Sequence, residues 1–230
     1  MALRVAFDLD GTVADMFTAL RQEADALFGE QRTIHGAGSV PDPAASDENP
    51  VVSALQLSAR EQVQLWDRVK HIENFWTTLP ELEPGIIARI AKAATERRWE
   101  VIFLTTRPSS AGDTTQLQSQ RWLRTHGFEF PSVFVVHGSR GKVADALGLD
   151  IVVDDRPENC LDVAVESKAK PILIWQGDPK VIPPGATRLG VKVAASISEA
   201  VALIERYDDL RRQPGMMKSL RRMLGKQQQV

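Results

Sequence analysis

The sequence predicts an α/β fold built on a mostly parallel sheet. Short apolar runs bounded by turn residues alternate along the chain with longer amphipathic segments. Strands that alternate with helices pair in parallel and are covered by helices on both faces of the sheet. The predicted strands are residues 3–7, 101–104, 133–136, 151–153 and 171–175.

The stretch between the first two strands interrupts this alternation. It contains two helical candidates, residues 16–28 and 58–71, separated by the Gly, Pro, Ser and Asp-rich residues 36–50. A loop of that length inside a compact domain is usually functional or mobile. We therefore predict a helical cap inserted beside the tip of the first strand. The predicted units are residues 1–15 and 81–205 for the core, 16–80 for the cap and 206–230 for a basic C-terminal tail.

Composition narrows the class of protein. The 230 residues are 43% hydrophobic and 25% charged, which is typical of a chain that buries a real core. A formal net charge of −2 gives no reason to expect a nucleic acid partner. The single cysteine, Cys160, cannot form an internal disulfide, which favours a reducing compartment. With no signal-peptide pattern and no apolar run near about 20 residues, we expect a cytoplasmic protein without a membrane span.

Two carboxylates follow the first predicted strand. Side chains alternate along a strand, so Asp8 and Asp10 face the same side and can contact one ligand. Gly11 permits a sharp turn directly after them. Aspartate and glycine are also ordinary turn residues, so this pair alone does not establish a functional site.

Further polar residues end two other predicted strands. Thr105 follows residues 101–104, and Asp154 with Asp155 closes residues 151–153. Ligands of parallel sheets bind beyond the carboxyl ends of the strands, so these side chains and the Asp8–Asp10 pair are predicted to share one crevice. Each residue has a structural alternative, a turn or a solvated helix position, but these alternatives do not explain the order of the whole set.

Four gathered carboxylates need cations to stay ionised. At about 4 Å and an effective dielectric constant near 20, each like-charged pair costs about 4 kcal/mol. Lys142, at the start of a helical candidate, is predicted to supply one positive charge. A divalent ion is predicted to supply the rest, and an oxygen-only site suits Mg²⁺ better than zinc.

These residues together resemble the haloacid dehalogenase superfamily of phosphohydrolases. The resemblance covers about residues 3–160. The segments starting at Asp10, Glu73, Leu82 and Asp154 are most similar to its 5′(3′)-deoxyribonucleotidase branch. The resemblance implies a three-layer Rossmann-like core, a cap after the first strand and a two-step mechanism.

The resemblance also implies roles for individual residues. Asp8 would attack phosphorus, and Asp10 would protonate the leaving oxygen and later deprotonate the hydrolytic water. Thr105 and Lys142 would bind phosphoryl oxygens. Mg²⁺ would be held by the Asp8 carboxylate, the Asp10 carbonyl and Asp155. Asp154 would contribute through water or by orienting Lys142.

Substrate-binding candidates lie beside these motifs. They are Thr106, Arg107, Phe17 and Trp76. The branch tends to carry an aromatic residue where this chain has Met16, and often a proline at position 107. Aromatic residues in a cap are more often core than ligand platform.

The leading hypothesis is therefore a Mg²⁺-dependent phosphatase of small phosphorylated metabolites, with nucleoside monophosphates as the first class. Alternatives within the same fold are a sugar phosphatase, a dehalogenase, or a phosphonate hydrolase that would need Lys70 as imine former. A further alternative is a non-catalytic phosphate-binding regulatory module whose basic tail recruits a partner. The tail has a Met/Leu stripe between its cations and is a candidate amphipathic arm for an anionic membrane or RNA. The alternative, which we favour, is a terminal helix that packs on the domain or on a partner subunit of a homo-oligomer.

Overall fold

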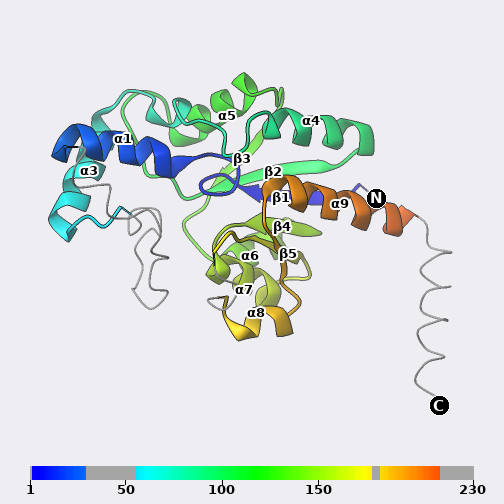
Figure 1. Ribbon diagram of the computed structural model, residues 1–230. Coiled ribbons are helices and arrows are strands. Elements are labelled where there is room, and N and C mark those ends of the chain that lie inside the picture. The colour runs from blue at the N-terminus through cyan, green and yellow to red at the C-terminus, as the bar shows by residue number, and fades with distance from the viewer. Residues whose placement is uncertain (1, 30–54, 178–181, 213–230) are drawn as a thin grey trace, which may run out of the picture.

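A computed structural model describes residues 2–29, 55–177 and 182–212 of the chain (Figure 1). Its strands are β1 (Arg4–Asp8), β2 (Glu100–Thr105), β3 (Ser132–Val135), β4 (Ile151–Asp154), β5 (Lys170–Ile174) and β6 (Lys192–Ala194). Its helices are α1 (Met16–Phe28), α3 (Ala59–His71), the short 3₁₀-helix η3 (Phe75–Thr77), α4 (Ile86–Arg97), α5 (Thr115–Thr125), α6 (Arg140–Ala146), α7 (Pro157–Glu166), α8 (Pro184–Arg188) and α9 (Ile197–Arg212).

The sheet is parallel throughout, and its strand order is β3-β2-β1-β4-β5-β6. This confirms the predicted α/β class, and the order is that of a doubly wound sheet. β1 lies between β2 and β4, with Phe7 opposite both Phe103 and Val153. The chain runs outward from β1 to β2 and β3 and then returns past β1 to β4. The strand order therefore reverses between β1 and β4, and the residues that follow these two strands stand at the topological switch point.

Alternate residues of each strand pack into different cores. Val5, Phe7 and Phe103 belong to the larger cluster, beneath α4, α5 and α9. Ala6 and Ile102 belong to a smaller cluster, beneath α6 and α7. Helices therefore cover both faces of the sheet, as Figure 1 shows with α4 and α5 above the strands and α6, α7 and α8 below them.

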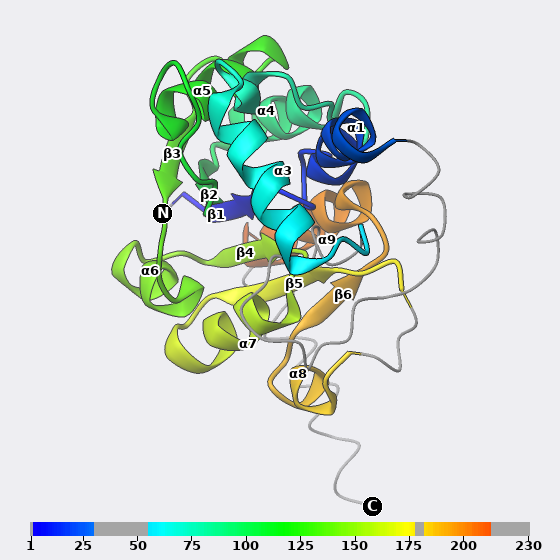
Figure 2. The ribbon, with the colours of Figure 1, turned by 90° about the vertical axis from the view of Figure 1, so that its left-hand side faces the viewer.

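The inserted helices lie beyond the carboxyl ends of the strands. Figure 2 shows α3 passing in front of that edge, beside α1. Ser58 begins α3 with a reciprocal capping box to Glu61. The buried residues Leu20 and Leu65 belong to the same cluster as the sheet residue Phe7, so the insert and the sheet share one continuous core.

Two predicted segments extend outside the described residues. The Gly and Pro-rich residues 36–50 lie outside them, as do residues 213–230 of the tail. The first part of the tail is the end of α9, which runs to Arg212. No helix among the described residues is long and apolar enough to cross a bilayer.

A buried carboxylate fastens α9 to the start of β2. Asp208 is fully buried and accepts a hydrogen bond from the Trp99 indole at 2.9 Å, while Arg212 lies 2.9 Å from the same oxygen. Burial raises the pKa of Asp208, but the hydrogen bonds from Arg212 and Trp99 outweigh it, so the pKa lies below its usual value of 3.8.

We expect Asp208→Asn to destabilise the protein at pH 7 by about 1.5–3 kcal/mol, because hydrogen bonds to a charged group are lost. A carboxyl whose pKa is lowered by folding stabilises the fold above its unfolded pKa, and this contribution disappears as the pH falls through the folded value. The difference in the free energy of unfolding between wild type and variant should therefore become smaller below about pH 4. Urea unfolding followed by tryptophan fluorescence at pH 7 and pH 3 measures this difference. A difference that does not change with pH would contradict a stabilising role for the ionised Asp208 carboxylate.

Helices α6 and α7 approach each other closely at Gly141. A methyl group at that position would overlap the backbone carbonyl of Asp162. We expect Gly141→Ala to destabilise the fold by about 1–3 kcal/mol, because the added carbon forces the helices apart. Gly138, three residues earlier, has no atom within 4 Å of such a carbon, so Gly138→Ala is the matched control. Chemical denaturation of both variants tests the contrast, which fails if the two lose the same stability.

Candidate active site

Asp8 ends the central strand and lies in the interior at the carboxyl edge of the sheet. It is 6% exposed, and its Oδ1 accepts a hydrogen bond from Arg140 Nη2 at 2.5 Å. Its Oδ2 accepts one from the backbone N–H of Asp10 at 3.1 Å. Burial and the charge of Asp154 raise the pKa of Asp8 well above its usual range, and Arg140 opposes this rise without cancelling it.

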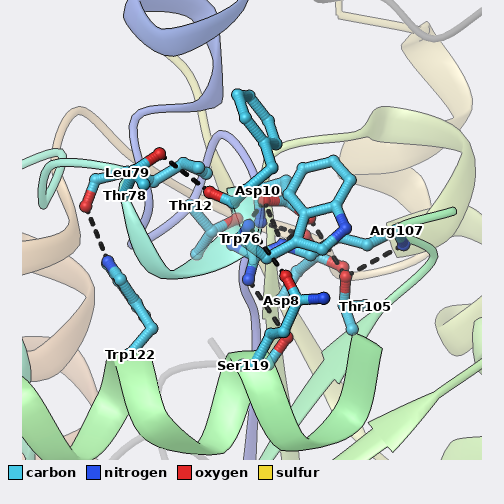
Figure 3. Close-up of polar contacts among 12 residues, drawn as sticks. Asp8, Asp10, Thr12, Trp76, Thr78, Leu79, Thr105, Arg107, Ser119 and Trp122 are labelled. Carbon is cyan, nitrogen blue, oxygen red and sulfur yellow. Dashed lines mark hydrogen bonds and ion pairs between the residues drawn. The ribbon is translucent and has the colours of Figure 1, made fainter. Parts of the chain in front are cut away.

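Asp10 is held by side chains from the end of β2. Its Oδ2 accepts a hydrogen bond from Thr105 Oγ1 at 3.0 Å. Arg107 Nε donates to both carboxylate oxygens, at 2.8 and 2.9 Å, and Arg107 Nη2 lies 2.7 Å from Oδ1. Figure 3 shows these three side chains converging from the ends of neighbouring strands. The parallel register brings them together, because Asp8 is paired with Leu104.

Asp155 directly follows β4 and lies against the loop that follows β1. Gly11 has a φ of +82°, and a Cβ there would overlap the Asp155 carboxylate, so only glycine fits this turn. Thr12 Oγ1 donates to Asp155 Oδ1 at 3.4 Å. Burial and the charge of Asp154 raise the pKa of Asp155 to about 8.

Asp154, the last residue of β4, contacts the start of α7 and Arg140. It is fully buried, and its carboxylate accepts hydrogen bonds from the Arg156 backbone N–H at 2.9 Å and from Asn159 Nδ2 at 3.0 Å. Arg140 Nε lies 3.6 Å from Asp154 Oδ2. The structure therefore places Asp154 as an anchor for α7 and Arg140.

Arg140 occupies the position that the sequence analysis gave to Lys142. Ser139 caps α6 by accepting hydrogen bonds from the backbone N–H groups of Gly141 and Lys142. The helix thus begins at Arg140, whose side chain is buried against Asp8, while Lys142 is exposed. The prediction that Lys142 neutralises the carboxylates is corrected on this geometry. Arg140 Nη1 is buried and has no hydrogen-bond partner among the described residues, which leaves a donor for an anion.

The four substrate-binding candidates fall into different environments. Thr106 is exposed and lines the pocket at the site. Phe17 is partly buried and packs against the main core. Trp76 is fully buried and donates its indole N–H to the Pro108 carbonyl at 2.9 Å, so it offers no free ring face. Arg107 borders the pocket; its Nε donates to Asp10 and its Nη1 to Ser119, whereas its Nη2, close to Asp10 Oδ1, makes no hydrogen bond among the described residues.

The carboxylates open onto a small polar cavity of about 40 Å³. Its lining residues are Asp8, Asp10, Met16, Thr106, Arg107, Pro108, Arg140, Asp155, Arg156 and Asn159. A volume of this size holds a few water-sized groups. A larger hollow of about 820 Å³ lies at the opposite edge of the sheet, near the starts of β1 and β2, and none of the predicted site residues lines it.

The donor set at this edge fits a hard cation together with an anion. Burial and then the charge of Asp154 raise the pKa values of Asp8 and Asp155, so a cation bound beside them would stabilise their ionised forms. Within the described ranges, no three His, Cys, Asp or Glu side chains are arranged to hold a metal unaided. Mg²⁺ commonly takes only one or two protein carboxylates and completes its octahedron with waters and phosphate oxygens. The residues present therefore fit Mg²⁺ accompanied by a phosphate, through Asp8, Asp155 and the backbone oxygen of Asp10.

Sequence reasoning missed three side chains that build the site: Arg140, Ser119 and Asn159. A signal existed for Arg140, because Ser139 is a favoured N-cap residue and fixes which of the following cations is turned inward. Ser119 and Asn159 are polar positions on α5 and α7 with no local pattern that marks them. Their roles come only from tertiary contacts.

Comparisons with known proteins agree on the architecture. No family model and no curated protein matches the chain. Among solved structures, it is similar to a HAD family hydrolase from Deinococcus radiodurans R1 with bound phosphate and sodium, at 16% identity and a TM-score of 0.52, covering 90% of this chain and 97% of that one. It is also similar to a predicted phosphatase from Clostridium acetobutylicum, at 13% identity and a TM-score of 0.53, covering 90% and 99%. For a putative β-phosphoglucomutase from Thermotoga maritima the values are 15%, 0.50, 89% and 99%. At such identities the likeness shows the fold: the chain has the α/β fold of haloacid dehalogenase-like hydrolases.

Proposed function

We propose that this protein is a Mg²⁺-dependent phosphomonoester hydrolase that acts through an aspartyl phosphate on Asp8. The observation that carries the proposal is the position of Asp8. It is a buried carboxylate at the carboxyl end of the central strand, paired with Arg140 and facing the same cavity as Asp10 and Asp155. A solved neighbour with this fold and bound phosphate adds support.

The chain's own groups divide the work of the reaction. Asp8 Oδ attacks phosphorus as the bond to the leaving oxygen breaks, and Asp10 gives that oxygen a proton. Water then attacks the phosphoryl group and passes a proton to Asp10, which frees Asp8 and inorganic phosphate. Arg140 donates a hydrogen bond to Asp8, and Thr105 donates one to Asp10, so both residues stabilise negative charge at this edge of the sheet. Bound Mg²⁺ would supply charge neutralisation of the phosphoryl oxygens.

The cavity bears on the substrate class. Its 40 Å³ suit the phosphoryl oxygens and leave the rest of a substrate outside, towards Thr106 and the inserted helices. Such a site accepts small phosphate monoesters of different alcohols. Nucleoside monophosphates are the first class to test, because the first and last motifs are most similar to nucleotidases, and sugar phosphates are the alternative class.

We expect purified protein with Mg²⁺ to release phosphate from members of a panel of deoxynucleoside, ribonucleoside and sugar monophosphates. Asp8→Asn should lower kcat by at least about 10³-fold, because the nucleophile is lost. The matched control is Asp145→Asn, since Asp145 is exposed on α6. Rapid acid quenching with labelled substrate should trap phosphate on the wild type and not on Asp8→Asn.

Two results would contradict the proposal. One is a folded wild type that releases phosphate from no member of the panel, which would favour the non-catalytic binding module. The other is an Asp8→Asn variant with wild-type turnover, which would exclude Asp8 as the nucleophile.

Mg²⁺ binding has a readout that does not depend on activity. At about 100 times its dissociation constant, an ion that binds only the folded state adds about 2.7 kcal/mol, which is about 5–10 °C in the melting temperature of a protein of this size. We expect that shift for the wild type and for Asp145→Asn, and its loss in Asp155→Asn, in differential scanning calorimetry.

The same variant is informative without metal. A carboxyl whose pKa is raised by folding weakens the fold as the pH rises above the usual 3.8 towards the folded value of about 8. Metal-free Asp155→Asn should therefore melt at or above the wild-type temperature at pH 7. A metal-free variant that melts well below the wild type would show that Asp155 serves the fold rather than a bound cation.

A further inference from the structure

We propose that Arg107 is a positioning residue that holds the Asp10 carboxylate in place for proton transfer. This inference rests on the proposed function and assigns Arg107 a role other than substrate binding. Arg107 Nε donates to both Asp10 carboxylate oxygens, at 2.8 and 2.9 Å, and Nη2 lies 2.7 Å from Oδ1 as an ion pair without a hydrogen bond. A rigid planar guanidinium that contacts both oxygens restrains the orientation of the carboxylate as well as its distance, whereas a lysine ammonium is a rotatable point charge.

Arg107 is itself held on every side. Its side chain is fully buried, and its Nη1 donates to Ser119 Oγ on α5 at 3.1 Å. The guanidinium carbon lies 5.0 Å from the ring centre of Trp76 and 5.8 Å from that of Trp122. Figure 3 shows the Trp76 ring beside Arg107, and Ser119 and Trp122 on the helix beneath them. A guanidinium fixed between two indoles and a hydroxyl has little freedom to reach a substrate.

The two indoles are in turn fastened to the backbone. Trp76 donates its ring N–H to the Pro108 carbonyl at 2.9 Å, and Trp122 donates its own to the Leu79 carbonyl at 2.7 Å. Trp76 belongs to η3, directly after the inserted helices, and Pro108 directly follows Arg107. The position of Asp10 therefore depends on a chain of buried contacts that runs from the insert through Arg107.

The proton transfer that this arrangement serves has a defined balance. In the first step the Asp8–phosphorus bond forms, the bond from phosphorus to the leaving oxygen breaks, and the Asp10 carboxyl proton passes to that oxygen. An alcohol and an aspartyl phosphate result. A displaced Asp10 cannot deliver the proton, and the leaving group must then depart as an anion.

Leaving groups differ in how much they need that proton. An alkoxide leaves poorly without protonation, whereas a nitrophenolate leaves readily as the anion. Loss of a positioned general acid should therefore slow an alkyl ester far more than a nitrophenyl ester. A general loss of structure or of phosphate binding should slow both esters equally.

The experiment compares kcat/KM for benzyl phosphate and 4-nitrophenyl phosphate, two esters of similar size, in the full-length protein with Mg²⁺. This constant reports only the steps up to departure of the leaving group, so hydrolysis of the aspartyl phosphate does not enter. The variants are Arg107→Gln and the milder Ser119→Ala, which removes one contact of the guanidinium. Arg124→Gln is the matched control, because Arg124 is exposed on α5, the helix that carries Ser119.

We expect Arg107→Gln to lower kcat/KM for benzyl phosphate by about 10²-fold and for 4-nitrophenyl phosphate by less than about 10-fold, the scale of a misplaced proton donor. Ser119→Ala should shift the ratio of the two constants in the same direction by a smaller factor, and Arg124→Gln should leave it unchanged. Melting curves of each variant identify any that fail to fold. If Arg107→Gln fails to fold, the ratio of the two kcat/KM values in Ser119→Ala tests the inference.

Three results would overturn the inference. Equal losses on both esters would make Arg107 a structural or phosphate-binding residue. Wild-type constants on both esters in both variants, or a faster reaction of benzyl phosphate, would show that the guanidinium does not place Asp10 productively. A wild type inactive on both esters and on the wider panel would instead refute the proposed function, and this inference with it.

Discussion

Two buried arginine–aspartate pairs are the constraint on which the arrangement of this site depends. Arg140 is paired with Asp8, and Arg107 with Asp10, at the carboxyl edge of the sheet. Removing one partner of such a pair leaves a buried charge uncompensated, at a cost of about 3–5 kcal/mol. The surrounding structure keeps both members of each pair together. Ser139 begins α6 at the residue that turns Arg140 inward, and both arginines lie almost wholly out of solvent.

Backbone hydrogen bonds tie the inserted helices to the loop that carries Arg107. Loops at strand ends are usually the mobile parts of an α/β fold. Here the backbone of the loop after β2 is bonded to the end of the insert: Ala111 donates to the Lys70 carbonyl, and Asn74 donates to the Ala111 carbonyl, both at 2.8 Å. The Asn74 side chain also accepts from the backbone of Asp113 at 2.9 Å. A shift of α3 would therefore also displace the loop that carries Arg107.

The sequence predicts those parts of the structure that depend on the local periodicity of apolar and polar residues. Strand alternation places Asp8 and Asp10, and parallel pairing brings Thr105 and Asp155 to them. The strand β6 was not predicted, because it has only three residues and two of them are exposed. Arg140 is not a candidate in the sequence analysis, because a shift of two residues in the predicted helix start changes which side chain faces inward. Trp76 and Arg107 are predicted ligand contacts, and the structure adds their buried intramolecular partners, which residue types alone do not reveal.

Charge arithmetic at the site sets an order of binding under the proposed function. Four carboxylates, Asp8, Asp10, Asp154 and Asp155, are compensated by two buried guanidinium groups, which leaves two negative charges when all are ionised. Burial is the largest cause of the raised pKa values of Asp8, Asp154 and Asp155, and the charges of neighbouring carboxylates raise those of Asp8 and Asp155 further. A phosphate ester dianion entering such a site would add repulsion. A divalent cation would remove the deficit and leave the Nη1 of Arg140, which has no hydrogen-bond partner among the described residues, as a donor for a phosphoryl oxygen. Under the proposed function, metal binding would therefore precede or accompany phosphate binding.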